Sequence, residues 1–222
     1  MTSLSSGSVC SGTPLSFGLT SNIPSSYSWV ATDNSNTTGE STTANSGSPI
    51  NNTLNNTSIT SQDVVYNVTP TASGTGCLGT SQTVTITVNP KPTMTNPNSG
   101  SVCSGNMVNF GLTSSVLSSI AWKATSNGNV NGESTTNQLG STITDILTIS
   151  STTPQTVTYT VTPTSGAAGS CVGGTFTVTI TVNPIPNVNG INNQVICNGS
   201  TTTGVTFTGN VAGTVYNWSN TN

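Results

Sequence analysis

The chain has 222 residues, of which only 3% are charged, and its formal net charge is −3. An ordinary globular protein has roughly 25% charged residues. The only cationic side chains are Lys91 and Lys123, and there is no histidine. Phosphate contacts require clustered Lys and Arg, so this composition excludes nucleic-acid binding. No apolar run approaches the length of a membrane span, so we also expect no membrane insertion.

Low charge with abundant Ser, Thr and Asn does not by itself predict disorder. Disordered chains usually combine low hydrophobicity with high net charge. Here 31% of the residues are hydrophobic, and many of them alternate with polar residues. This pattern predicts a folded β-protein whose surface is polar but nearly uncharged.

The sequence repeats itself with a period of 93 to 94 residues. The segment SGSVCSGTPLSFGLTS (6–21) returns as SGSVCSGNMVNFGLTS (99–114), and TVTITVNPKP (83–92) returns as TVTITVNPIP (177–186). A third copy begins after Pro184, where VICNGS follows the pattern of the earlier VCSG openings. We therefore predict repeat 1 at 1–90, repeat 2 at 91–184 and an incomplete third repeat at 185–222, as part of a longer array.

Within each repeat, apolar residues alternate over short segments separated by turn residues. In chain order the alternating sets of repeat 1 are Leu15, Phe17 and Leu19; Tyr27 and Trp29; Val64, Tyr66 and Val68; and Val84, Ile86 and Val88. Repeat 2 has equivalents of each set. A period of two residues indicates strands with one buried and one solvated face, and no helical period is visible.

About seven short strands in roughly 90–100 residues are typical of an immunoglobulin-like sandwich. We therefore predict an all-β fold of tandem immunoglobulin-like repeats, two complete and one truncated. The Asn-Pro-x-Pro segments at 89–92 and 183–186 are predicted to be stiff linkers, because proline fixes its own φ angle. The aromatic residues at equivalent positions are assigned to the core: Trp29, Trp122, Trp218, Tyr66, Tyr159, Phe17 and Phe110.

Four motifs recur in the same order in both repeats. They are the V-C-S-G opening, a central S-x-x-W, the Y-x-V-T-P strand and the closing T-V-T-x-T-V-N-P. In this order they resemble the PKD-like or immunoglobulin-like repeats of giant surface proteins from gliding Bacteroidetes. The resemblance covers essentially the whole chain. It implies export by the type IX secretion system and an extracellular location on the bacterial cell surface, in an adhesin or a gliding-motility filament.

The five cysteines follow the repeat. The repeat arithmetic predicts one disulfide in each complete repeat, Cys10 with Cys77 and Cys103 with Cys171, and leaves Cys197 unpaired. The alternative is that the cysteines are free thiols. In a standard immunoglobulin sandwich the two predicted partners lie at opposite ends, whereas a disulfide needs Cα atoms within about 7 Å. The connectivity therefore stays open at this point.

Two residue types that catalytic sites often use, histidine and arginine, are missing from the sequence. Without histidine or arginine the chain has no ready general base and no clamp for an anion, so we expect no enzyme activity. We expect no cofactor either. Two cysteines per repeat are too few for zinc. Glu40 and Glu133 recur in a Gly-Glu-Ser context, for which a local hydrogen bond is favoured over a calcium or sugar contact.

The leading hypothesis is a non-catalytic structural or adhesive segment of a long cell-surface filament. Its expected partners are the neighbouring repeats and, through edge strands that lack guarding lysines, other copies in a fibre. The alternative hypothesis is a carbohydrate-binding accessory module of a secreted protein. In that case the tryptophans would stack on a surface polysaccharide instead of filling the core.

Overall fold

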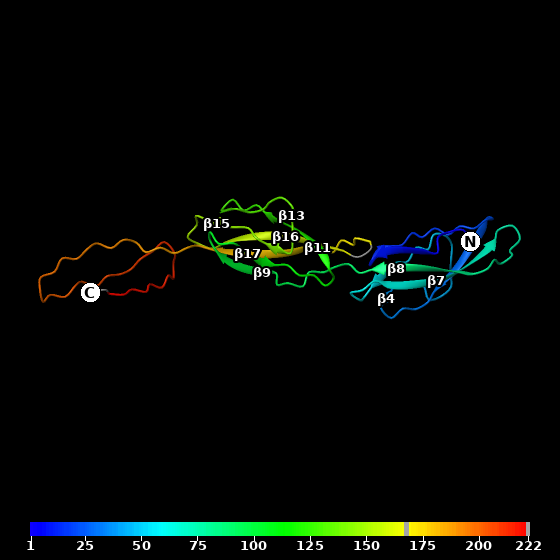
Figure 1. Cartoon of the computed structure of the whole chain (residues 1–222), viewed down its shortest axis with the longest axis horizontal. Coiled ribbons are helices and arrows are strands. Elements are labelled where there is room, and N and C mark those ends of the chain that lie inside the picture. Colours follow the sequence, from blue (N-terminus) through cyan, green and yellow to red (C-terminus); the bar gives the residue numbers. More distant parts are fainter. Residues whose placement is uncertain (167–168, 221–222) are drawn as a thin grey trace. The chain divides into compact units, whose positions relative to one another are not determined.

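The computed structural model describes residues 1–166 and 169–220. Every regular element in these ranges is a β-strand, which confirms the predicted all-β class (Figure 1). No helix long and apolar enough to cross a membrane occurs among these residues. The chain divides into two compact units. The first comprises Met1–Asn96, Leu112–Ala121 and Thr162–Thr175, and the second comprises Pro97–Gly111, Trp122–Val161 and Phe176–Asn222.

Repeat 1 folds into two facing sets of strands. The larger sheet has the order β1-β8-β7-β3-β5, with bounds Ser6–Cys10, Gln82–Asn89, Gln62–Ala72, Ser25–Ala31 and Asn45–Ser46. The smaller sheet has the order β2-β6-β4, with bounds Thr13–Pro14, Thr53–Asn56 and Thr37–Thr38. All pairs are antiparallel except β1 with β8, which is parallel.

Repeat 2 has the same strand order in its larger sheet. This sheet runs β13-β11-β16-β17-β9, with bounds Gln138–Leu139, Ser118–Thr125, Gln155–Ser165, Phe176–Asn183 and Ser99–Cys103. Two separate pairs of short strands complete repeat 2. They join β10 (Phe110–Gly111) to β14 (Thr142–Ile143) and β12 (Val130–Asn131) to β15 (Thr148–Ile149). The parallel edge pair recurs as β9 with β17.

The period-two alternation fills the core as predicted. The inward side chains of β7 and β8 are buried, as are their equivalents on β16 and β17. Trp29 is 2% exposed and meets the ring of Tyr66 edge-on, with centroids 5.7 Å apart. Trp122 is 4% exposed and meets Tyr159 in the same way at 5.8 Å. Such edge-to-face pairs add about 1 kcal/mol to the stability gained from burial alone.

Phe17 and Phe110 are only partly buried. Each lies over the glycine of its edge strand: a Cβ at Gly7 would be 3.0 Å from the Phe17 ring, and a Cβ at Gly100 would be 3.0 Å from that of Phe110. The missing glycine side chain therefore leaves the space that the ring occupies. These phenylalanines are partly buried and pack at the edge of the core to which they were assigned.

The assignment of Trp218 to a core is wrong for this chain. Its side chain is 74% exposed, and residues 185–220 form no strand. Without strands there is no sheet face against which the indole can pack. Two parts of this segment are nevertheless joined, because the backbone N–H groups of Asn187 and Asn210 each donate to the other's side-chain oxygen.

The buried tyrosines predict how stability depends on pH. Burial raises the pKa of Tyr66 well above its ordinary value, and the negative charge of Glu40 adds to this. Burial also raises the pKa of Tyr159, and its hydrogen bond to Asp145 raises it further. The native state therefore favours both phenols in their protonated form. The stability that they contribute is complete below the ordinary pKa near 10 and is lost as the pH rises above it.

We expect the free energy of unfolding to fall above pH 10 by about 1 kcal/mol per pH unit for each of these tyrosines. Denaturant unfolding between pH 8 and 11.5, with free thiols alkylated beforehand, measures this. The control is the Tyr66→Phe, Tyr159→Phe double variant, which should show a much shallower decline. An equally steep decline in the variant would show that other groups set the pH dependence.

Candidate functional site

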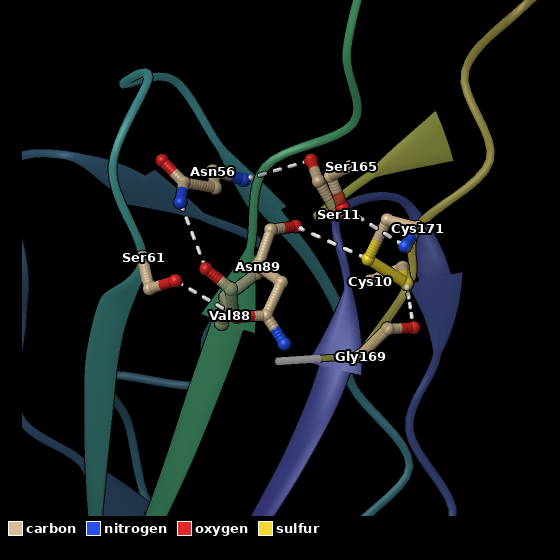
Figure 2. The surroundings of a disulfide bond; sticks show 9 residues. All are labelled: Cys10, Ser11, Asn56, Ser61, Val88, Asn89, Ser165, Gly169 and Cys171. Carbon is tan, nitrogen blue, oxygen red and sulfur yellow. Dashed lines mark hydrogen bonds between the residues drawn. A yellow bond between two sulfur atoms is a disulfide. The ribbon is translucent and has the colours of Figure 1, made fainter. Parts of the chain in front are cut away.

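A single disulfide is present among the described residues, and it joins the two repeats. It links Cys10, the last residue of β1, to Cys171 in the connection between β16 and β17 (Figure 2). The two Cα atoms are 5.6 Å apart, within the usual range for a disulfide. The sequence separation of 161 residues makes it a covalent link from repeat 1 to repeat 2, and all its atoms lie within the first compact unit.

The predicted pairing within each repeat is wrong. Cys10 and Cys171 are bonded to each other, whereas Cys77, Cys103 and Cys197 are exposed free thiols. The parallel register of β1 with β8 places Cys10 opposite Asn89, where β8 ends, while Cys77 precedes the start of β8. The eight residues of β8 hold these two ends roughly 25 Å apart, so Cys10 cannot reach Cys77.

Hydrogen bonds fix both ends of the disulfide. Cys171 is 1% exposed; its N–H donates to Ser165 Oγ at 3.0 Å, and its carbonyl accepts from the Ser165 N–H at 2.9 Å. After Cys10, the N–H of Ser11 donates to the Asn89 carbonyl at 2.8 Å. The sulfurs lie 3.8 Å from the Gly169 carbonyl and 4.0 Å from that of Asn89. These are packing contacts, because a bridged sulfur carries no proton to donate.

Asn89 is the polar centre of the site shown in Figure 2. Its side chain is 1% exposed, and its Oδ1 accepts a hydrogen bond of 2.8 Å from Ser61 Oγ. A Cβ at Gly169 would lie 2.6 Å from Asn89 Nδ2, and Gly169 has a φ of +107°. Both the conformation and the space therefore require glycine at position 169. The Nδ2 group itself is buried with no hydrogen-bond partner among the described residues.

The Asn-Pro-x-Pro segment that follows β8 is docked against residues of repeat 2. Pro90 and Pro92 are buried, and any Cβ at Gly173 would collide with the Pro92 carbonyl oxygen. Beyond it, the Ser115 N–H donates to the Thr93 carbonyl at 2.8 Å, and the Thr93 N–H donates to Ser115 Oγ at 3.0 Å. The predicted stiff linker is thus held by packing and hydrogen bonds, in addition to its own proline stiffness.

The two repeated glutamates make local hydrogen bonds. Oε1 of Glu40 accepts from Thr37 Oγ1 at 2.8 Å, and Oε1 of Glu133 accepts from the Asn127 N–H at 3.0 Å. Burial raises the pKa of Glu133. No group of three or more His, Cys, Asp or Glu side chains capable of holding a metal occurs in 1–166 or 169–220. Through their hydrogen bonds the two glutamates anchor the loops in which they lie.

Asp145 is a buried polar residue that the sequence reasoning missed. Its carboxylate accepts three hydrogen bonds, from the Ser134 N–H at 2.8 Å, Ser134 Oγ at 2.7 Å and the Tyr159 hydroxyl at 2.9 Å. In repeat 1 the same place is taken by Asn52, which accepts from the Tyr66 hydroxyl at 2.8 Å. The available signal was the offset of 93 between Asn52 and Asp145, equal to that between Tyr66 and Tyr159.

Comparison with known proteins identifies the repeats. The sequence profile of the PKD-like domain matches residues 7–92 and, again, residues 100–186. The two matches coincide with the two sandwiches and together include the residues that form the disulfide. No curated protein matches the chain.

Several solved structures share weak similarity with the chain. Mouse cadherin-23 EC22-24 has 10% identity and a TM-score of 0.33 over 83% of this chain and 64% of that one. Human CDH23 EC21-23 has 11% identity and a TM-score of 0.35 over 95% and 85%, respectively. Drosophila N-cadherin EC1-4 has 14% identity and a TM-score of 0.30 over 82% and 50%. The chain spans less than two thirds of the mouse structure, and similarity at this level carries no functional argument.

The docking of the Asn-Pro-x-Pro segment can be tested with a glycine pair. Gly173→Ala should push Pro92 away and hinder Cys10 from reaching Cys171. Overpacking of this kind costs about 1–3 kcal/mol, which corresponds to roughly a tenfold or larger shift of the disulfide equilibrium in glutathione buffers. The measurement is the fraction of the Cys10–Cys171 bond formed at a series of redox ratios.

Gly79→Ala is the matched control. A Cβ at Gly79 would be 2.9 Å from the Pro70 ring, as a Cβ at Gly173 would be from Pro163, but Gly79 has no linker carbonyl beside it. The control should leave the disulfide equilibrium unchanged. Equal shifts in the two variants would mean that the proline ring, and not the docked linker, explains the effect.

Proposed function

Because the chain belongs to the PKD-like domain family, we propose that it is a non-catalytic structural and adhesive repeat segment of a bacterial cell-surface filament. One observation carries this proposal: the disulfide that joins the first strand of one repeat to a loop of the next. A spacer that must transmit force gains directly from such a link.

The position of the disulfide determines which residues feel tension. A pull applied to the two ends of the chain passes from Cys10 to Cys171 through the sulfur–sulfur bond. The strands between these residues, including β3, β7, β11 and β16, are bypassed. In the chain-entropy model, closing a loop of this length also stabilises the folded state by about 5 kcal/mol.

The chemistry of the chain supports an extracellular setting. Disulfides persist in oxidising compartments and are rare in the cytosol. The resemblance of the repeats to giant surface proteins of gliding Bacteroidetes supports the finer proposal of display through the type IX secretion system. Attachment to surfaces or gliding motility is then the activity that the filament serves.

The carbohydrate-binding alternative has less support. It relied on tryptophan rings that stack on sugars, but the indoles of Trp29 and Trp122 are almost completely buried. Trp218 is exposed, yet it lies in a segment that forms no strand to hold a binding surface.

Single-molecule stretching tests the proposed mechanical role. When the chain is pulled from its two termini without reductant, the segment between Cys10 and Cys171 should not contribute to the contour length. Reduction should then release about 550 Å of additional contour length, since 161 residues extend by about 3.4 Å each. Cys10→Ser should show the full length without reductant, whereas Cys103→Ser, which removes a free thiol, should behave like the parent. Equal lengths with and without reductant would contradict the proposal.

A further inference from the structure

Each half of the observed disulfide has an unbonded counterpart in the other repeat. Cys103 lies 93 residues after Cys10, and Cys77 lies 94 residues before Cys171. Both counterparts are exposed free thiols.

The surroundings of Cys103 repeat those of Cys10. Cys103 ends β9 and pairs with Asn183 in the parallel register that Cys10 has with Asn89. The Ser104 N–H donates to the Asn183 carbonyl at 2.8 Å, as the Ser11 N–H does to that of Asn89. An Asn-Pro-x-Pro segment follows in both cases. The backbone that presents the first cysteine is therefore already formed at Cys103.

The surroundings of Cys77 repeat those of Cys171. The carbonyl of Cys77 accepts from the Ala72 N–H at 2.9 Å, as that of Cys171 accepts from the Ser165 N–H. Two residues later, the Gly79 N–H donates to the Pro70 carbonyl at 2.8 Å, and the Gly173 N–H donates to that of Pro163 at 2.9 Å. The loop that presents the second cysteine has thus the same backbone hydrogen bonds without its partner.

The bonded cysteine loop and its unbonded equivalent differ in how far their residues are buried. Cys171 is buried, whereas Cys77 is exposed. Likewise Pro92 is buried, but its equivalent Pro186 is exposed. This difference in burial follows from docking, because the Asn-Pro-x-Pro segment at 89–92 packs against the loop that carries Cys171, which we call the occupied loop.

A groove marks the unoccupied loop of repeat 1. Its volume is about 400 Å³, and its lining includes Ile23, Pro70, Cys77, Leu78 and Gly79. The equivalents of Pro70 and Gly79 are Pro163 and Gly173, which flank Pro92 in the occupied loop. The groove therefore lies where an Asn-Pro-x-Pro segment lies in repeat 2.

We propose that the disulfides of this array form a ladder in which the first cysteine of every repeat bonds to the second cysteine of the next repeat. Cys77 and its groove receive the first cysteine and the Asn-Pro-x-Pro segment of a preceding repeat. Cys103 bonds to the second cysteine of a following repeat. This inference rests on the proposed function, since it extends the single observed link along the filament.

The bond forms by thiol–disulfide exchange with a disulfide oxidant such as oxidised glutathione. The Cys103 thiolate attacks one glutathione sulfur and releases one reduced glutathione. The thiolate of the second cysteine then attacks the Cys103 sulfur and releases another. Two protein thiols are oxidised, and one glutathione disulfide is reduced to two thiols.

The test is a full chain lengthened by one of its own repeats. A second copy of residues 93–186 is inserted after Pro186, which places the inserted copy's Cys103 94 residues after Cys103, the spacing that Cys103 and Cys197 have in the original chain. The inserted copy carries two mass markers, one near each of its cysteines. Ser101→Thr, at an exposed strand position, marks its Cys103 peptide, and Gly174→Ala marks its Cys171 peptide, because a Cβ there would meet nothing within 4 Å. The chain is refolded in glutathione buffer, free thiols are alkylated, and peptic peptides are mapped by mass spectrometry.

The expected result is two disulfides, Cys10 with Cys171 and Cys103 with the inserted copy's Cys171. Alkylation of Cys103 should fall at least tenfold relative to the unlengthened chain. It should return to the original level when the inserted copy carries Cys171→Ser. Gly173→Ala in the inserted copy should lower the yield of the new bond, whereas Gly79→Ala should not.

Other outcomes separate the inference from the proposed function. If Cys10–Cys171 forms while Cys103 stays free, or if the inserted copy bonds its own two cysteines, the ladder is overturned and the observed link stands. If Cys10–Cys171 is itself absent, both fail. A chain lengthened at the other end, with residues 1–93 placed before Met1, is an independent test. Gly74→Ala in the added copy, where a Cβ would meet nothing within 4 Å, distinguishes its Cys77 peptide from that of the original Cys77. The added copy's Cys10 should bond to the original Cys77, and a reduced original Cys77 would overturn the ladder.

Discussion

The parallel pairing of β1 with β8 is the constraint on which the rest of the structure depends. It fixes Cys10 opposite Asn89, at the end of the sheet where the chain leaves repeat 1. An antiparallel edge strand would run the other way and turn the cysteine back toward its own β7–β8 connection. Because the strand is parallel, the first cysteine lies beside the segment by which the chain leaves repeat 1, and the bond to Cys171 becomes geometrically available.

The joint next to this pair is made of backbone and small side chains. Asn89 is buried against Gly169, and the carbonyl of Pro92 approaches Gly173 where no side chain would fit. A chain with two lysines and five acids has few ion pairs to offer, so hydrogen bonds of Ser, Thr and Asn take their place. Proline removes conformational freedom from the connecting segment, which lowers the entropy lost when the segment docks.

Most of the fold could be predicted from the sequence, but little of the site could. Alternating residues such as Val64, Tyr66 and Val68 predicted the buried face correctly, because local alternation reports burial directly. The disulfide pairing was wrong because it depends on the parallel register of β1, which no local pattern encodes. Trp218 shares the register of Trp29 and Trp122, but a repeat position alone does not provide the strands that cover it. Asp145 was missed because the same position in repeat 1 is an asparagine.

The most direct test of this account is disulfide mapping of the unreduced, natively alkylated chain. The account predicts one linked peptide pair, joining Cys10 to Cys171, and alkylation of the other three cysteines before reduction. Linked peptides joining Cys10 to Cys77 and Cys103 to Cys171 would contradict it. Each repeat would then be closed by its own disulfide, and only the backbone would join it covalently to its neighbour.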